Sequence, residues 1–295
     1  MPKGPKKFYL HLVSDASGTT LLGISRAILS QFSGIKPSQK FWPLIRSDRQ
    51  LERVLRKISE KPGPVIFTLV REDMRIRLMN HCNALEIPCM PVLEPIIQRF
   101  SSYLGLPAAG VPGLQYALDD EYFRRVAAMD FAMRNDDGRT YDELKKADVI
   151  LVGISRTSKT PTSMFLARSG ILTANLPLVP GIGVAEKYLR LKKPLYVGLT
   201  AHPSHLRALR YNRIKSGDGN VAALIDSNDY IDENKIEEEV RSARRLFTEH
   251  GWPIIDVTKR SIEETSAEIF SIMQMREEQR KQERKQTGKN HDQNT

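Results

Sequence analysis

The chain has 295 residues, of which 40% are hydrophobic and 27% charged, and its formal net charge is +10. This length and composition predict a globular protein with one large or two ordinary domains, and no apolar stretch is long enough to cross a membrane. The positive charge favours acidic ligands without requiring nucleic acid, and two cysteines without partners at metal-ligand spacing favour a reducing, cytoplasmic location over a zinc site.

The N-terminal third alternates predicted strands and helices. Strands are predicted at residues 8–14, 40–45, 65–70 and 86–91, and helices at 20–32, 48–60, 72–84 and 95–104. Elements of this length and order predict βαβ units, and therefore a parallel-sheet α/β domain over residues 1–105. The turn after the first strand, from Asp15 to Thr20, is rich in hydroxyl groups and contains Gly18. It is either an ordinary capped turn or a second ligand loop.

A stretch rich in glycine and proline, residues 105–113, marks the best candidate boundary. We expect residues 106–146 to form a helical connector with a helix at 118–134. The helical spacing places Phe123, Val126, Ala127 and Asp130 on one face. An aspartate on an apolar face is either a buried acid paired with Arg134 or a catalytic carboxylate.

Asn135-Asp-Asp-Gly138 ends this predicted helix and places two further carboxylates, Asp136 and Asp137, side by side in the sequence. Asp-Gly is first of all a turn signal, and a chemical role for the pair is the alternative.

The most informative segment is the loop Gly153–Thr160, which lies between an apolar run at 148–154 and a helix opened by Pro161. It matches the phosphate-binding pattern G-x-x-x-x-G-K-[ST], except that Ser158 replaces the second glycine. A serine at positive φ costs on the order of 1 kcal/mol, so the loop is either strained or takes a different path. Because a helix N-terminus attracts anions, a strand, this loop and a helix in succession predict a phosphate site.

The predicted cradle for a diphosphate comprises Gly153, Ile154, Ser155, Arg156, Thr157, Ser158, Lys159 and Thr160. Lys159 would reach the terminal phosphate, Arg156 would add a second cation, and the Thr160 hydroxyl would hold Mg²⁺. The alternative is a polar turn in which Lys159 and Arg156 are merely solvated.

Strands predicted at 174–179, 194–199, 221–225 and 253–257 complete a P-loop-type α/β domain over residues 147–275. Asp226 and Asp256 lie at the carboxyl ends of the last two of these strands, at the sheet edge where ligands bind, and either could orient a magnesium-bound water. Ser261–Glu264 is a capping box that opens the last helix. Residues 276–295 are charged and predict a helix extension that frays into a disordered tail. No internal repeat is apparent.

Four segments resemble the bacterial pyruvate, phosphate dikinase regulatory proteins: HLVSDASGTTL, YFRRVAAMDFAMRNDDG, ADVILVGISRTSKTPTSMFLA and PIIDVTKRSIEETSAEI. The resemblance implies a bifunctional enzyme. One activity is an ADP-dependent serine/threonine kinase that phosphorylates a threonine of the dikinase when its catalytic histidine is itself phosphorylated. The other is a phosphorylase that removes this phosphate with inorganic phosphate and releases pyrophosphate. A sibling branch acts on phosphoenolpyruvate synthase and more often carries Cys-Gly where this chain has Thr157-Ser158, which favours the dikinase branch.

In this hypothesis Lys159 and Arg156 neutralise charge on the transferring group, and a carboxylate accepts the threonine proton. The candidates for that carboxylate are Asp130 and Asp137, with Asp15 behind them. Three alternatives stay open: the same chemistry on phosphoenolpyruvate synthase, a non-catalytic ADP-sensing module, and a basic nucleic-acid binder, although no groove-reading motif is recognisable. The sequence leaves the oligomeric state open, a homodimer included.

Overall fold

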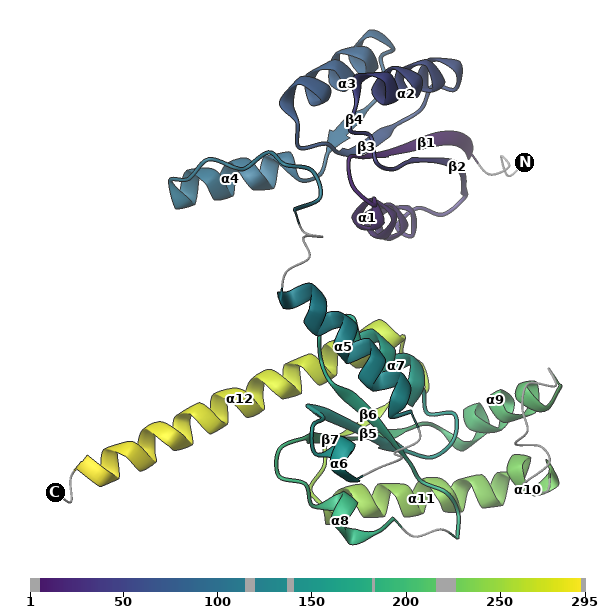
Figure 1. Cartoon of the computed structure of the whole chain (residues 1–295). Helices are drawn as coiled ribbons and strands as arrows, with labels where there is room; N and C mark the ends of the chain where they lie inside the picture. Colours follow the sequence, from purple (N-terminus) through teal and green to yellow (C-terminus); the bar gives the residue numbers. More distant parts are fainter. Residues whose placement is uncertain (1–5, 115–119, 137–140, 182–183, 216–226, 293–295) are drawn as a thin grey trace. The chain divides into compact units, whose positions relative to one another are not determined.

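The computed structural model describes residues 6–114, 120–136, 141–181, 184–215 and 227–292. The chain divides into two compact units, Met1–Ala117 and Leu118–Thr295. Each unit contains a four-stranded sheet in which every strand pairing is parallel (Figure 1). The predicted α/β class with two parallel-sheet domains is therefore confirmed.

The N-terminal unit has the strand order β2-β1-β3-β4. Its elements are β1 (Lys6–Ser14), α1 (Thr19–Leu29), β2 (Ile35–Trp42), α2 (Asp48–Glu60), β3 (Val65–Thr68), α3 (Glu72–Ala84), β4 (Cys89–Pro91) and α4 (Glu94–Leu104). Helix α1 covers one face of the sheet, and α2 and α3 cover the other (Figure 1). All four residues of β3 are buried, as expected for a strand with helices on both sides.

The second strand of this unit differs from the prediction of 40–45. It starts at Ile35, ends at Trp42 and lies at the sheet edge, where half-buried and exposed residues largely alternate. Pro37 is tolerated because an edge strand can leave one side of its backbone unpaired. Leu44, with φ of 59°, leaves the extended conformation and ends the apolar run that suggested a later strand.

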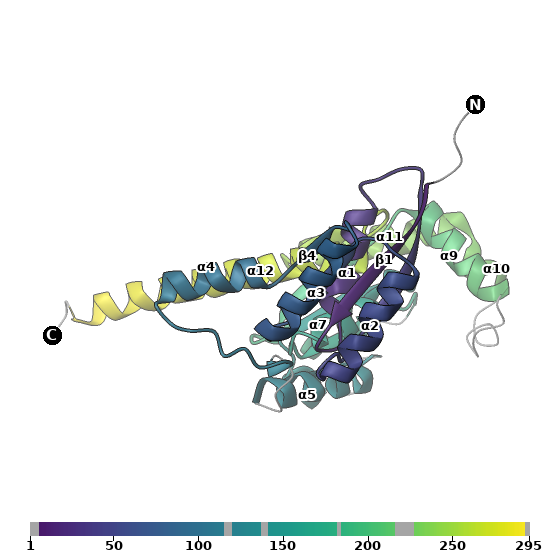
Figure 2. The ribbon, with the colours of Figure 1, turned by 90° about the horizontal axis from the view of Figure 1, so that it is seen from above.

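The C-terminal unit has the strand order β6-β5-β7-β8. Its strands are β5 (Val149–Gly153), β6 (Thr173–Pro177), β7 (Leu195–Thr200) and β8 (Ile254–Asp256). Its helices are α5 (Asp120–Arg134), α6 (Tyr141–Leu144), α7 (Lys159–Ala167), α8 (Glu186–Leu189), α9 (Pro203–Lys215), α10 (Ser227–Ile231), α11 (Glu233–Glu249) and α12 (Ile262–Asp292). Helices α5, α7 and α12 lie on one face of the sheet and α11 on the other, with α9 and α10 packed beside α11 (Figures 1 and 2). The strand predicted at 221–225 lies outside the described residues.

The two sheets share one strand order, although no repeat is visible in the sequence. In each unit the first strand lies inside the sheet, the second pairs on one side of it, and the third pairs on the other. Short right-handed crossovers favour this arrangement for any chain with the appropriate pattern of strands and helices. In such sheets, ligands bind near the carboxyl end of the first strand, where the chain changes direction.

Helix α5, expected in a connector between domains, packs within the C-terminal unit. Ala128 and Ala132 lie against Ala167 of α7, and these small side chains let the two helices approach closely. The predicted apolar face is wrong, because Phe123 and Val126 are exposed. The alanines form the buried face instead.

The capping box at the start of α12 is confirmed. The Ser261 N–H donates to Glu264 Oε2 at 2.8 Å, and the Glu264 N–H donates to Ser261 Oγ at 3.1 Å. The helix continues to Asp292 and so includes most of the segment 276–295, for which a helix extension was predicted. Its composition of Glu, Gln, Lys and Arg and the Glu277–Lys281 ion pair favour a solvated helix. Of the helices that the structure describes, none combines the length and apolarity that a bilayer crossing requires.

Candidate active site

The 153–160 loop connects the end of β5 to the start of α7, as predicted. Two of its residues adopt left-handed backbone conformations, Arg156 with φ of 71° and Ser158 with φ of 58°. Each costs on the order of 1 kcal/mol relative to a relaxed residue. The serine that replaces glycine is therefore strained rather than accommodated by another path, and such strain is typical of functional loops.

Gly153 is required by the tight fold of this loop. A Cβ at this position would lie 2.6 Å from Thr157 Oγ1 and 2.7 Å from the Leu199 carbonyl oxygen of β7. Thr157 is buried, and its hydroxyl donates to the Ile154 carbonyl at 2.9 Å. The loop thus closes on itself and rests on the carboxyl end of the neighbouring strand.

Two cations lie in the loop. Lys159 Nζ donates to the carbonyls of Gly153 and Ile154, both at 2.8 Å. Arg156 Nε is buried and has no hydrogen-bond partner among the described residues. A buried donor of a charged group without an acceptor is costly, so this nitrogen fits an anionic ligand that would accept from it.

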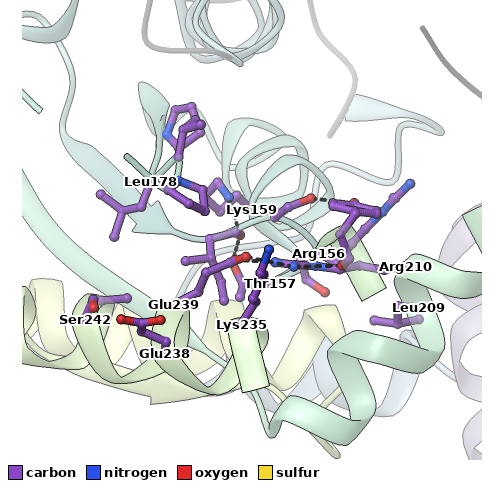
Figure 3. Close-up of a pocket in the computed structure, with 18 of the residues that line it drawn as sticks. Arg156, Thr157, Lys159, Leu178, Leu209, Arg210, Lys235, Glu238, Glu239 and Ser242 are labelled. Carbon is purple, nitrogen blue, oxygen red and sulfur yellow. Dashed lines mark hydrogen bonds and ion pairs between the residues drawn. The ribbon is translucent and has the colours of Figure 1, made fainter. Parts of the chain in front are cut away.

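The loop opens into a cavity of about 1600 Å³. Figure 3 shows Arg156, Thr157, Lys159, Arg210 and Glu239 in the same pocket. Apolar side chains complete the wall: Val179, Val184, Leu189, Leu209 and Leu246. A cavity of this size and mixed lining can hold a nucleotide together with a side chain of another molecule.

A buried ion pair forms part of the cavity wall. Arg210 of α9, with a side chain 1% exposed, donates to Glu239 Oε1 at 3.1 Å and Oε2 at 2.6 Å. Its guanidinium also lies over the Tyr230 ring, 4.7 Å from the centroid. The Tyr230 hydroxyl is 2.9 Å from Ser155 Oγ. Helices α9, α10 and α11 are thereby connected to the 153–160 loop.

One carboxylate contacts the loop directly. Asp136 Oδ1 accepts a hydrogen bond from Thr160 Oγ1 at 2.6 Å and a second from Asn175 Nδ2. Asp136 and Thr160 both line the cavity, whereas Asn175, in the middle of β6, is buried. The residue that the sequence identified mainly as a turn former is therefore part of the site.

The other carboxylates considered from the sequence lie elsewhere or are not described. Asp130 Oδ2 accepts from Arg134 Nη2 at 2.6 Å, and both side chains are more than half exposed rather than buried. Asp256 Oδ1 accepts from the Thr258 N–H at 2.9 Å at the end of β8. Asp137 and Asp226 lie outside the described residues. Asp15 belongs to the N-terminal unit, where its Oδ2 accepts from the Val70 N–H at 2.7 Å and burial raises the pKa of its carboxyl.

Residues 10–270 match the kinase/pyrophosphorylase family. The chain belongs to this family. A protein from Rhodopseudomonas palustris (strain BisA53) is 45% identical over 280 residues, which cover 95% of this chain and 99% of the relative. Relatives from Nitrobacter winogradskyi (95% of this chain, 99% of the relative) and Bradyrhizobium diazoefficiens (95% and 99%) are also 45% identical. All three carry the provisional name pyruvate, phosphate dikinase regulatory protein.

Membership of the kinase/pyrophosphorylase family identifies the protein as a phosphotransferase and agrees with the geometry of the site. Both activities in the family's name act on phosphoryl groups. The 153–160 loop has a strained backbone and a buried Arg156 Nε without a hydrogen-bond partner among the described residues, two features that suit an oxyanion. The loop lies within the matched region.

The sequence did not reveal that Arg210, Tyr230 and Glu239 line the same cavity as the loop. Arg210 and Glu239 are 29 positions apart on different helices, and Tyr230 reaches Ser155 across 75 positions. No local spacing predicts such pairs. Asp136 did carry a signal, its place beside a helix end in a cluster of carboxylates, but only the fold brings it to Thr160.

Proposed function

We propose that this protein regulates pyruvate, phosphate dikinase in the cytoplasm, by phosphorylating a threonine of the dikinase with ADP and by removing that phosphate with inorganic phosphate. The observation that supports this most directly is the buried Arg156 Nε, which has no hydrogen-bond partner in the described part of the chain and belongs to a strained loop that lines a nucleotide-sized cavity. The names of the relatives support the choice of target.

In the kinase direction, the threonine oxygen attacks the β-phosphorus of ADP, the bond to the bridging oxygen breaks, and AMP leaves with the bond electrons. Arg156 and Lys159 would neutralise charge on the transferring group, since they flank the loop backbone that receives it. The threonine proton passes to a carboxylate, for which Asp130 and Asp137 are the proposed candidates. Asp130 would first have to leave its ion pair with Arg134.

In the phosphorylase direction, an oxygen of inorganic phosphate attacks the phosphorus of phosphothreonine. The threonine oxygen leaves and takes up a proton, and pyrophosphate is released. One anion pocket serves both directions, because inorganic phosphate occupies the place that the β-phosphate of ADP takes in the kinase reaction. The Thr160 hydroxyl fits a magnesium ion, which when bound would neutralise phosphate charge.

The test combines the purified protein with dikinase whose catalytic histidine is phosphorylated and with ADP labelled in its β-phosphate. We expect label on a dikinase threonine and one AMP per phosphate transferred, followed by release of labelled pyrophosphate when inorganic phosphate replaces ADP. Phosphoenolpyruvate synthase in place of dikinase is the specificity arm. Label on the synthase but not on dikinase would move the target to the sibling branch. ADP binding without AMP release in the presence of either target would leave a sensing module.

A further inference from the structure

We propose that Asp136 and Thr160 form a divalent-cation site at the N-terminus of α7, with Asp136 as the positioning residue that aligns the Thr160 hydroxyl. The proposal rests on the proposed function, because the cation would enter with a diphosphate. It assigns the magnesium-orienting carboxylate to Asp136 instead of Asp226 or Asp256, the two candidates from the carboxyl ends of the later predicted strands.

The first argument is the direction of the Thr160 hydroxyl. A hydroxyl has one hydrogen and two lone pairs, and the hydrogen of Thr160 is donated to Asp136 Oδ1 at 2.6 Å. The lone pairs are therefore left for a cation. A carboxylate that accepts a hydrogen bond from a metal-ligating hydroxyl fixes the orientation of that hydroxyl and raises the basicity of its oxygen. Groups in the outer shell of metal sites generally act in this way.

The second argument is the environment of the Asp136 carboxylate. Asp136 Oδ1 accepts hydrogen bonds from both Thr160 and Asn175. Asp136 Oδ2 accepts no hydrogen bond and forms no ion pair within the described part of the chain. A carboxylate beside a loop that binds an oxyanion would repel that ligand. A cation between the carboxylate and the anion converts this repulsion into two attractive contacts.

The third argument is the oxygen content of the cluster. Asn175 is 1% exposed, its amide nitrogen is fixed on Asp136, and its Oδ1 is buried without a partner among the described residues. Hydroxyl, carboxylate and amide oxygens are the hard donors that Mg²⁺ and Mn²⁺ select. Histidine and cysteine play no part in this cluster, so zinc does not fit it.

The experiment measures ADP affinity by calorimetry with excess EDTA and with excess Mg²⁺, for the wild type and for Asp136→Asn. The dissociation constant for ADP in EDTA divided by that in Mg²⁺ reports the coupling between cation and nucleotide. Asparagine keeps an oxygen for the Thr160 hydroxyl but removes the charge. We expect the ratio to fall about 10- to 100-fold, while affinity in EDTA stays the same or rises. Asp142→Asn, an exposed carboxylate paired with Lys145, is the matched control and should keep the wild-type ratio.

If the Asp136 variant fails to fold, two substitutions at the exposed residue Thr160, Thr160→Val and Thr160→Ser, provide an independent test. The valine variant should lower the ratio and the serine variant should preserve it. Binding of Mn²⁺, measured by electron paramagnetic resonance with and without ADP, should be weakened by Asp136→Asn and Thr160→Val alike.

Several outcomes separate this proposal from the proposed function. The cation site would be overturned if the wild-type protein bound ADP equally well in EDTA and in Mg²⁺. It would also be overturned if the Asp136→Asn variant kept the wild-type ratio but had a lower melting temperature, because the contact would then be purely structural. Wild-type protein that binds no ADP would overturn the proposed function. In that case Mn²⁺ binding that depends on Asp136 would still support the site, and its absence would overturn it.

Discussion

Replacing Arg210 by methionine should unfold the C-terminal unit more readily than any surface substitution. The Arg210 side chain is 1% exposed and that of Glu239 13%, and two hydrogen bonds join them. Removing the cation leaves the Glu239 carboxylate buried without its partner, which typically costs about 3–5 kcal/mol of unfolding free energy. With a urea slope of about 2 kcal/mol per molar, the midpoint should fall by roughly 1.5–2.5 M.

The double variant Arg210→Met with Glu239→Leu distinguishes the cost of a stranded charge from the cost of lost packing. Replacement of both charges by apolar side chains is often neutral or stabilising, so the double variant should recover most of the loss. Arg245→Met is the matched control on α11. It breaks an exposed pair with Glu249 and should cost about 0.5 kcal/mol or less.

Tryptophan fluorescence in urea can follow this unit alone. The sequence contains two tryptophans, Trp42 in the N-terminal unit and Trp252 in the C-terminal unit. Trp252 stacks on Tyr196 with ring centroids 4.6 Å apart, so its emission reports the packing of the unit around β7. In a Trp42→Phe background the signal comes from Trp252. An Arg210→Met midpoint within error of the wild type, or a double variant less stable than the single one, would refute the reasoning.

Four further predictions follow from single contacts. Gly153→Ala should abolish ADP binding measured by calorimetry, because its Cβ would meet a backbone carbonyl at 2.7 Å; Gly23→Ala, with open space around it, should not. Lys159→Glu should eliminate both transfer activities in the labelled assay, since it reverses charge in the loop, and activity in either direction would exclude the proposed mechanism. Tyr230→Phe should raise the KM for ADP about fivefold with little change in melting temperature, because one hydrogen bond of about 1 kcal/mol to the loop is lost. Burial raises the pKa of Asp15, so the folded state binds more protons than the unfolded state just above pH 3.8. The unfolding free energy of the N-terminal unit should therefore fall as pH rises through this window. Asp15→Asn should flatten the plot of unfolding free energy against pH.

The parts of the site that the sequence predicts are those set by neighbouring residues. The 153–160 loop follows a buried strand and precedes a proline-led helix, so its position depends only on local pattern, and even the strain at Ser158 could be anticipated. The Arg210–Glu239 pair depends on how α9 packs on α11, which no local spacing encodes. At Asp130 the local pattern gave a wrong prediction. The helical spacing suggested that the face containing Asp130 is buried, whereas α5 packs through its alanines and leaves Asp130 exposed.

The same distinction applies to the fold as a whole. Strand order is repeated in the two units although their sequences show no repeat, because parallel crossovers restrict topology more than side chains do. The first loop of each sheet nevertheless differs in chemistry. Asp15, a buried carboxylate, follows β1, whereas the corresponding loop after β5 carries Arg156 and Lys159. Topology therefore provides the position at the carboxyl end of the first strand, and the side chains decide what it binds. In the C-terminal unit those side chains are two cations in the 153–160 loop and Asp136, which is hydrogen-bonded to Thr160, a combination that suits a diphosphate accompanied by a divalent cation.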